Sequence, residues 1–118
     1  MLREQKGPLR PGIVVDLDLT NFDKAISWAT LPILVDFWAG WCTPCKIMKP
    51  VLEEMAEAHA GRVLFAKVNV DENPSIAQRY GVLSIPNFVL FHGGKPIDRA
   101  VGAVGRHGLE SLLRKNVV

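Results

Sequence analysis

The pattern of apolar and polar positions along the chain changes repeatedly between the period of a strand and that of a helix. Apolar runs rich in β-branched and aromatic residues predict three strands, and segments with apolar residues three or four positions apart predict a helix after each run. A hairpin around Gly93 and Gly94 and a closing amphipathic segment complete the pattern. The predicted strands are 13–19, 33–39, 62–70 and the two arms of 87–103, and the predicted helices are 20–31, 43–60, 73–80 and 106–116.

This order of elements, β-α-β-α-β-α-β-β-α, predicts an α/β domain with a central mixed five-stranded sheet flanked by four helices. Alternation through the first three strands implies right-handed crossovers and parallel pairing, and the final hairpin adds antiparallel strands. The run 33–39 is apolar on both faces apart from Asp36, which is typical of a strand covered by helices on both sides. We expect the strand 13–19 to lie near an edge.

Local signals place the ends and the buried side of the helices. Thr20 and Asp23 have the spacing of a capping box, and Asn73 before a proline is typical of an N-cap. Pro50 lies inside the helix 43–60 and is expected to kink it. The apolar stripe predicted for that helix consists of Ile47, Met48, Val51, Leu52, Met55 and Ala56.

Composition and charge narrow the function classes. The 118 residues suffice for one domain, and 48% hydrophobic with 22% charged residues is ordinary for a globular protein. A net charge of +2 without a basic helix face argues against nucleic-acid binding, and no apolar run is long enough to cross a membrane. The polar start lacks a secretory signal, so we expect a cytoplasmic protein. We also expect a monomer, with a flexible extension at 1–12 and one domain at 13–118.

The two cysteines of the chain, Cys42 and Cys45, lie where the strand 33–39 ends and the helix 43–60 begins. Unpaired N–H groups and the helix dipole concentrate positive potential there, which stabilises a thiolate at Cys42, the nucleophile of disulfide exchange. Cys45, one turn further on, is close enough to attack a mixed disulfide formed at Cys42, and we expect it to be less exposed. The pair therefore predicts a redox catalyst.

Two other functions of the cysteine pair fit the sequence less well. A disulfide across so short a loop removes little entropy from the unfolded state, and the cytoplasm would reduce it. A structural zinc site takes four ligands, whereas the histidines, His59, His92 and His107, are dispersed. We therefore expect no metal and no cofactor apart from the redox-active disulfide.

Asp36 and Lys67 are lone charges within apolar strands. Burial raises the pKa of a carboxyl, and a carboxylate of raised pKa behind the cysteine helix can accept the proton of Cys45 as that thiol resolves the mixed disulfide. If the two strands are neighbours, Lys67 lies near Asp36 and moderates its ionisation. The alternative is that the Lys67 side chain simply extends to solvent.

Three separated segments, "ILVDFWAGWCTPCK", "AKVNVDENPSIAQRYGVLSIPNFVLF" and "GGKPIDRAVGA", resemble the thioredoxin family in order and separation, over about residues 13–118. The resemblance implies a thioredoxin fold and a protein-disulfide reductase recharged by a thioredoxin reductase. It makes Cys42 the attacking thiol, Cys45 the resolving thiol, Asp36 the buried carboxylate and Lys67 its charged neighbour.

The resemblance also implies a substrate-binding rim. Pro86 matches the cis-proline packed beside the sulfurs, an assignment that rests on the resemblance alone, and the backbone of Ile85 then pairs with an extended substrate. The residues expected to contact disulfide-containing protein substrates are Trp41, Thr43, Pro44, Ile85, Gly102 and Ala103.

Three features depart from the family pattern. Thr43 stands where glycine is most frequent, Asn87 stands where threonine is usual, and the first dozen residues are additional. The strongly oxidising members carry histidine before the second cysteine, whereas this chain has Pro44, so we expect a reductant. The alternatives are a disulfide oxidase or isomerase, and a binding or assembly module that uses the rim.

Overall fold

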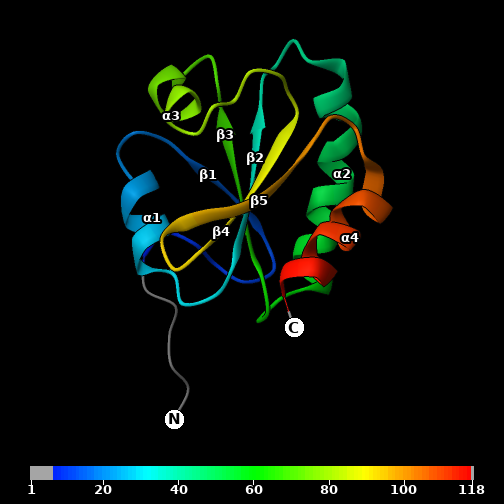
Figure 1. Ribbon diagram of the computed structural model, residues 1–118. Helices are drawn as coiled ribbons and strands as arrows, with labels where there is room; N and C mark the ends of the chain where they lie inside the picture. Colours follow the sequence, from blue (N-terminus) through cyan, green and yellow to red (C-terminus); the bar gives the residue numbers. More distant parts are fainter. Residues whose placement is uncertain (1–6, 118) are drawn as a thin grey trace.

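The computed structural model describes residues 7–117 and shows one sheet with helices packed on both faces (Figure 1). The order of elements is the predicted one, and the five-stranded mixed sheet with four helices is confirmed. The strands are β1 (Val14–Leu17), β2 (Ile33–Trp38), β3 (Leu64–Asn69), β4 (Asn87–His92) and β5 (Lys95–Val101), and the helices are α1 (Phe22–Trp28), α2 (Thr43–Ala58), α3 (Pro74–Arg79) and α4 (Gly105–Asn116).

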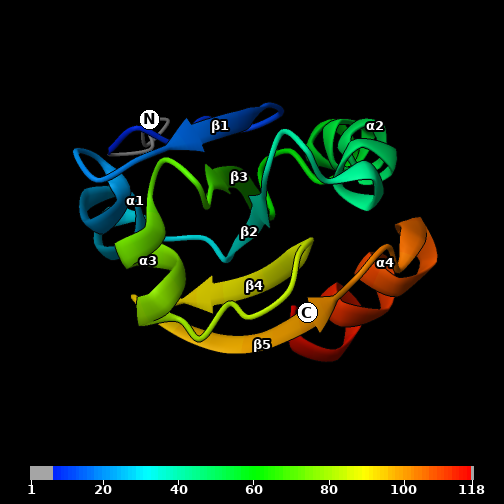
Figure 2. The same cartoon turned by 90° about the horizontal axis from the view of Figure 1, so that it is seen from above.

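The strands are arranged in the order β1-β3-β2-β4-β5. β1, β3 and β2 pair in parallel, and β4 pairs antiparallel with both β2 and β5, so β1 is an edge strand as predicted. Helices α1 and α3 cover one face of the sheet, and α2 and α4 cover the other (Figure 2). Within residues 7–117 no helix has both the length and the hydropathy needed to cross a membrane.

The central strand β2 contributes to the core on both faces of the sheet. Val35 and Phe37 pack in the cluster that α1 and α3 cover, whereas Leu34 packs in the cluster under α2 and α4. Successive side chains of a strand point to opposite faces, so a strand buried on both sides needs apolar residues at every position. The same alternation directs Asp36 to the α2 side, where it is the single charged residue of the strand.

Of the two local predictions about helix starts, the N-cap at Asn73 is confirmed and the cap at Thr20 is wrong. Thr20 does not cap α1, because Asn21 occupies the N-cap and the backbone N–H and hydroxyl of Thr20 both donate to the carboxylate of Asp18. Asn73 does occupy the N-cap of α3, but its side chain makes no capping hydrogen bond. Its Oδ1 instead accepts from the N–H of Leu19, at 3.2 Å, and so joins two loops far apart in sequence.

The buried side of α2 is narrower than predicted. Met48, Leu52, Met55 and Ala56 are buried, whereas Ile47 is 61% exposed, so its place in the stripe is wrong. One helical residue rotates the side-chain direction by about 100°, which carries position 47 out of the sheet-facing sector. The helix continues through Pro50, and the kink there stays a prediction.

The segment before β1 contributes to the core. Leu9 is 1% exposed and packs in the cluster under α1 and α3. The guanidinium of Arg10 donates to the carbonyls of Gly7 and Leu9, which holds the segment in place. Packing within the described residues therefore reaches back to Leu9, which lies in the stretch predicted as a flexible extension, and residues 1–6 of that extension lie outside the described residues.

Leu34 allows a direct test of this core. Leu34→Ala is expected to lower the free energy of unfolding by about 3 kcal/mol, because Leu34 is fully buried and its truncation leaves a cavity. The matched control is Leu83→Ala, since Leu83 is 97% exposed and its truncation should cost less than about 0.5 kcal/mol. Urea denaturation of both variants measures the difference, and equal losses would contradict the burial of Leu34.

Candidate active site

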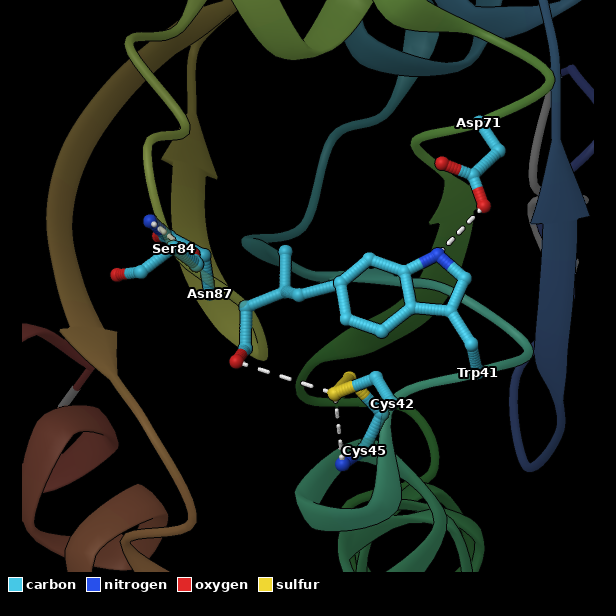
Figure 3. Close-up of a disulfide and its surroundings, with 7 residues drawn as sticks. Trp41, Cys42, Cys45, Asp71, Ser84 and Asn87 are labelled. Carbon is cyan, nitrogen blue, oxygen red and sulfur yellow. Dashed lines mark hydrogen bonds between the residues drawn. A yellow bond between two sulfur atoms is a disulfide. The ribbon is translucent and has the colours of Figure 1, made fainter.

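The two cysteines lie at the start of α2 and form a disulfide (Figure 3). Cys42 is the N-cap of the helix, and its Sγ accepts a hydrogen bond from the backbone N–H of Cys45 at 3.2 Å. Pro44, which lacks an N–H, occupies the first turn, where no intrahelical partner is needed. In the reduced protein, the same N–H and the helix dipole stabilise a thiolate at Cys42.

The environment of the disulfide is apolar and closed. Cys42 and Cys45 are each 3% exposed, so the expectation that Cys45 would be the less exposed of the two is wrong. Both pack in a small cluster with Trp38, Val70 and Ile85. Cys42 is buried because these residues cover it, and its Sγ lies 3.9 Å from the carbonyl oxygen of Ile85.

The segment opposite the sulfurs contains Pro86, which is buried, and the Ile85–Pro86 peptide bond is cis. The carbonyl of Pro86 accepts from the N–H of Gly102 at 2.8 Å, so the loop after β5 lies beside the same site. The structure therefore brings Ile85, Pro86 and Gly102 together next to Cys42. Ala103 follows on that loop and is exposed.

Trp41 forms one wall of a groove beside the disulfide. Trp41 is 70% exposed, and its indole Nε1 donates to Oδ2 of Asp71 at 2.8 Å, which fixes the ring orientation (Figure 3). The groove has a volume of about 360 Å³ and is lined by Trp41, Val70, Val82, Leu83, Ser84 and Ile85. Sequence reasoning missed Leu83, and the available signal was a large apolar residue within a short connecting loop.

Asp36 is 4% exposed, and its Oδ1 has no hydrogen-bond partner among the described residues. Burial raises the pKa of this carboxyl to about 7, although the charge of Lys67, its neighbour in the β2–β3 register, lowers the pKa in part. A cavity of about 70 Å³ touches both Asp36 and Cys45, and that volume can hold a water molecule. A carboxyl whose pKa is raised toward neutrality and that lines the same cavity as Cys45 has the position to exchange a proton with that thiol through water.

Two alternatives were open for Lys67: that it moderates the ionisation of Asp36, or that its side chain extends to solvent. The structure shows features of both. Its Nζ lies 3.8 Å from Oδ1 of Asp16 at the exposed sheet edge and 5.2 Å from the ring centre of Trp38. The ammonium group therefore extends toward solvent while its charge still acts on Asp36.

Thr43, Pro44 and Asn87 lie near the disulfide in the sequence pattern but make no described hydrogen bond to either sulfur. Thr43 and Pro44 are exposed, and within residues 7–117 no hydrogen bond joins the Thr43 hydroxyl to either sulfur. Asn87 is buried, and its Nδ2 donates to the carbonyl of Ser84 at 3.3 Å (Figure 3).

The part of the chain that the structure describes contains no group of three or more His, Cys, Asp or Glu placed to hold a metal.

Comparison with known proteins agrees with the family resemblance seen in the sequence. The family model described as thioredoxin matches residues 13–115. The chain is 52% identical over 93 residues to the thioredoxin of Alicyclobacillus acidocaldarius, which covers 79% of this chain and 88% of that protein. It is 42% identical over 98 residues to thioredoxin 1 of a Nostoc species, with 83% and 92% covered. It is also 43% identical over 98 residues to the bifunctional thioredoxin reductase/thioredoxin of Mycobacterium leprae, covering 83% of this chain and 21% of that protein.

Proposed function

The chain belongs to the thioredoxin family, and on that premise we propose that it works as a reductant of protein disulfides. It is a protein-disulfide oxidoreductase that acts by dithiol–disulfide exchange through Cys42 and Cys45. The observation that carries the proposal is the hydrogen bond from the Cys45 N–H to Sγ of Cys42 at a helix N-terminus. This contact favours Cys42 as the attacking thiolate and leaves Cys45 as the resolving thiol.

In the proposed reaction, the Cys42 thiolate attacks one sulfur of the substrate disulfide and forms a mixed disulfide. The first substrate sulfur leaves as a thiolate and takes a proton from water. The Cys45 thiol then loses its proton to Asp36 and attacks Sγ of Cys42, which closes the Cys42–Cys45 disulfide and releases the second substrate sulfur as a thiolate that takes a proton from water. Two electrons pass from the dithiol to the substrate, and Lys67 limits how far the pKa of Asp36 rises.

Substrate binding is proposed to use the rim around Cys42. In the described part of the chain no hydrogen bond occupies the N–H of Ile85, so this backbone is free to pair with an extended substrate segment. The side chains proposed to contact the substrate are those of Trp41, Thr43, Pro44, Ile85 and Ala103, together with the backbone of Gly102.

The partners follow from the same premise. Members of the family act on disulfide substrates and are re-reduced by a thioredoxin reductase, and the Mycobacterium leprae relative carries both names in one protein. We propose a reductase of that class as the electron donor, and we propose that the protein works as a cytoplasmic monomer without nucleic-acid or membrane partners.

The proposed function is tested by insulin reduction with dithiothreitol as the electron source. The protein is expected to accelerate precipitation of the reduced insulin chains well above the rate with dithiothreitol alone. A rate equal to that background would contradict the proposal. An assembly module would instead keep its partner when both cysteines are replaced by serine, so partner binding by that double variant separates the two functions.

Thr43→Gly tests whether the unusual residue between the cysteines tunes the reduction potential. Because the Thr43 hydroxyl contacts neither sulfur, we expect the potential to change by less than about 15 mV, half the shift that changes the equilibrium tenfold. Pro44→His is the comparison variant, since the strongly oxidising members carry histidine there, and it is expected to raise the potential. Equilibration with glutathione redox buffers measures both. A larger shift for Thr43→Gly would assign Thr43 a direct role.

A further inference from the structure

The loop between α3 and β4, residues 80–86, forms the wall of the groove that faces Trp41. It contains Leu83, which is 97% exposed, and Ile85, whose carbonyl oxygen lies 3.9 Å from Sγ of Cys42. Val82 and Ile85 pack against the core, whereas the exposed Leu83 does not, so the position of Leu83 depends on how the backbone of the loop is held.

Arg99 of β5 holds the start of this loop. Its Nη2 donates to the carbonyl oxygen of Tyr80 at 2.5 Å, and its Nη1 donates to that of Gly81 at 3.4 Å. Within residues 7–117 neither carbonyl has another hydrogen-bond donor. Figure 2 shows the connection from α3 to β4 passing beside β5, the strand on which Arg99 pairs with Val89.

The far end of the loop is held by other contacts. The carbonyl of Ser84 accepts from Nδ2 of Asn87, and the carbonyl of Pro86 accepts from the N–H of Gly102. Between the two ends, the described contacts of Val82 and Leu83 include one backbone hydrogen bond, from the Val82 N–H to the carbonyl of Ala77. At the α3 end, Tyr80 and Val82 also pack against the core cluster under α1 and α3, and Arg99 is the side chain that binds the carbonyls of Tyr80 and Gly81 there.

The chemistry of arginine suits this task. A guanidinium has several N–H donors in a planar fork, so one side chain can reach two successive carbonyls. Tyr80 follows α3 directly, and a cation near a helix C-terminus also interacts favourably with the helix dipole.

We propose that Arg99 is a positioning residue for substrate docking. By binding the carbonyls of Tyr80 and Gly81, it holds Leu83 and Ile85 at a fixed distance from Trp41, so that the groove is already formed when a protein substrate arrives. The inference rests on the proposed function, because the groove matters only if protein disulfides dock there. Arg99 contacts neither sulfur and takes no part in the electron or proton transfers.

The test compares Arg99→Ala with a matched control, Lys95→Ala. Lys95 is exposed on the same strand and makes no ion pair within residues 7–117, so its removal changes the charge without affecting the loop. Arg99→Ala is expected to raise KM for insulin about fivefold with kcat unchanged, the effect of losing a charge-assisted contact that organises the site. Arg99→Lys should recover part of the affinity, and Lys95→Ala should match the wild type.

Two further measurements separate positioning from general damage. Reduction of hydroxyethyl disulfide, which is too small to need the groove, should proceed at the wild-type rate in Arg99→Ala. Backbone 15N order parameters of Val82 and Leu83 should fall in that variant alone. An unchanged KM for insulin, or an equal loss with the small disulfide, would overturn the proposal. A wild type that leaves insulin intact would contradict the proposed function instead, and the order parameters would still decide whether Arg99 holds the loop.

Discussion

A Cys42→Ser variant is expected to lose protein-disulfide reduction completely, whereas Cys45→Ser is expected to retain the attack and to accumulate a mixed disulfide with its substrate. The difference follows from the geometry at the start of α2, where the Cys45 N–H donates to Sγ of Cys42. A serine hydroxyl at position 42 stays protonated at neutral pH and forms no disulfide. A serine at position 45 leaves the thiolate of Cys42 intact but removes the thiol that releases the substrate.

The measurement combines insulin reduction with mass spectrometry of the trapped complex. Circular dichroism serves as the control for folding, because both cysteines are buried and each variant replaces a sulfur by a smaller oxygen. Activity retained by Cys42→Ser would contradict the assignment of the nucleophile. A mixed disulfide trapped by Cys42→Ser rather than by Cys45→Ser would reverse the two roles.

The elements of the fold could be predicted because each follows from local periodicity. The run from Ile33 to Trp38 has no polar face, so it had to be a central strand, and the same reasoning made Asp36 conspicuous. Some errors are local, such as the cap predicted at Thr20 and the place of Ile47 in the helical stripe, whereas the error at Leu9 concerns contacts between segments far apart in sequence. Leu9 looked like part of a polar tail, and only the packing of that segment under α1 shows it in the core.

The candidate site could likewise be predicted only where it depends on single residues and their spacing. The spacing of Cys42 and Cys45 and the charge of Asp36 are visible in the sequence, whereas the cavity joining Asp36 to Cys45 is set by how α2 packs on the sheet. Arg99 carried no signal, because an arginine on an edge strand is ordinary until its partner carbonyls are known.

Asp36→Asn is expected to stabilise the oxidised protein at pH 8 by up to about 4 kcal/mol, the free energy of shifting a carboxyl pKa from its usual 3.8 to about 7. The native state holds the Asp36 proton more tightly than the unfolded state does. The contribution of Asp36 to wild-type stability is therefore greatest below pH 4, falls as the pH rises from about 4 to about 7, and stays level above that. An amide cannot ionise, so the variant lacks this decline.

The same substitution should affect catalysis in the opposite direction, because the group that receives the Cys45 proton is removed. Resolution of the mixed disulfide is expected to slow and to lose its inflection near pH 7. Asp16→Asn is the matched control, since Asp16 is an exposed carboxylate on the edge strand β1, which pairs with the strand of Lys67, and it also lies near Lys67. Urea denaturation across pH 4 to 8 and stopped-flow resolution kinetics measure the two effects. The Asp36→Asn variant could be more stable at high pH and still resolve the mixed disulfide at the wild-type rate. That result would show that buried Asp36 lowers the stability of the protein and has no catalytic role.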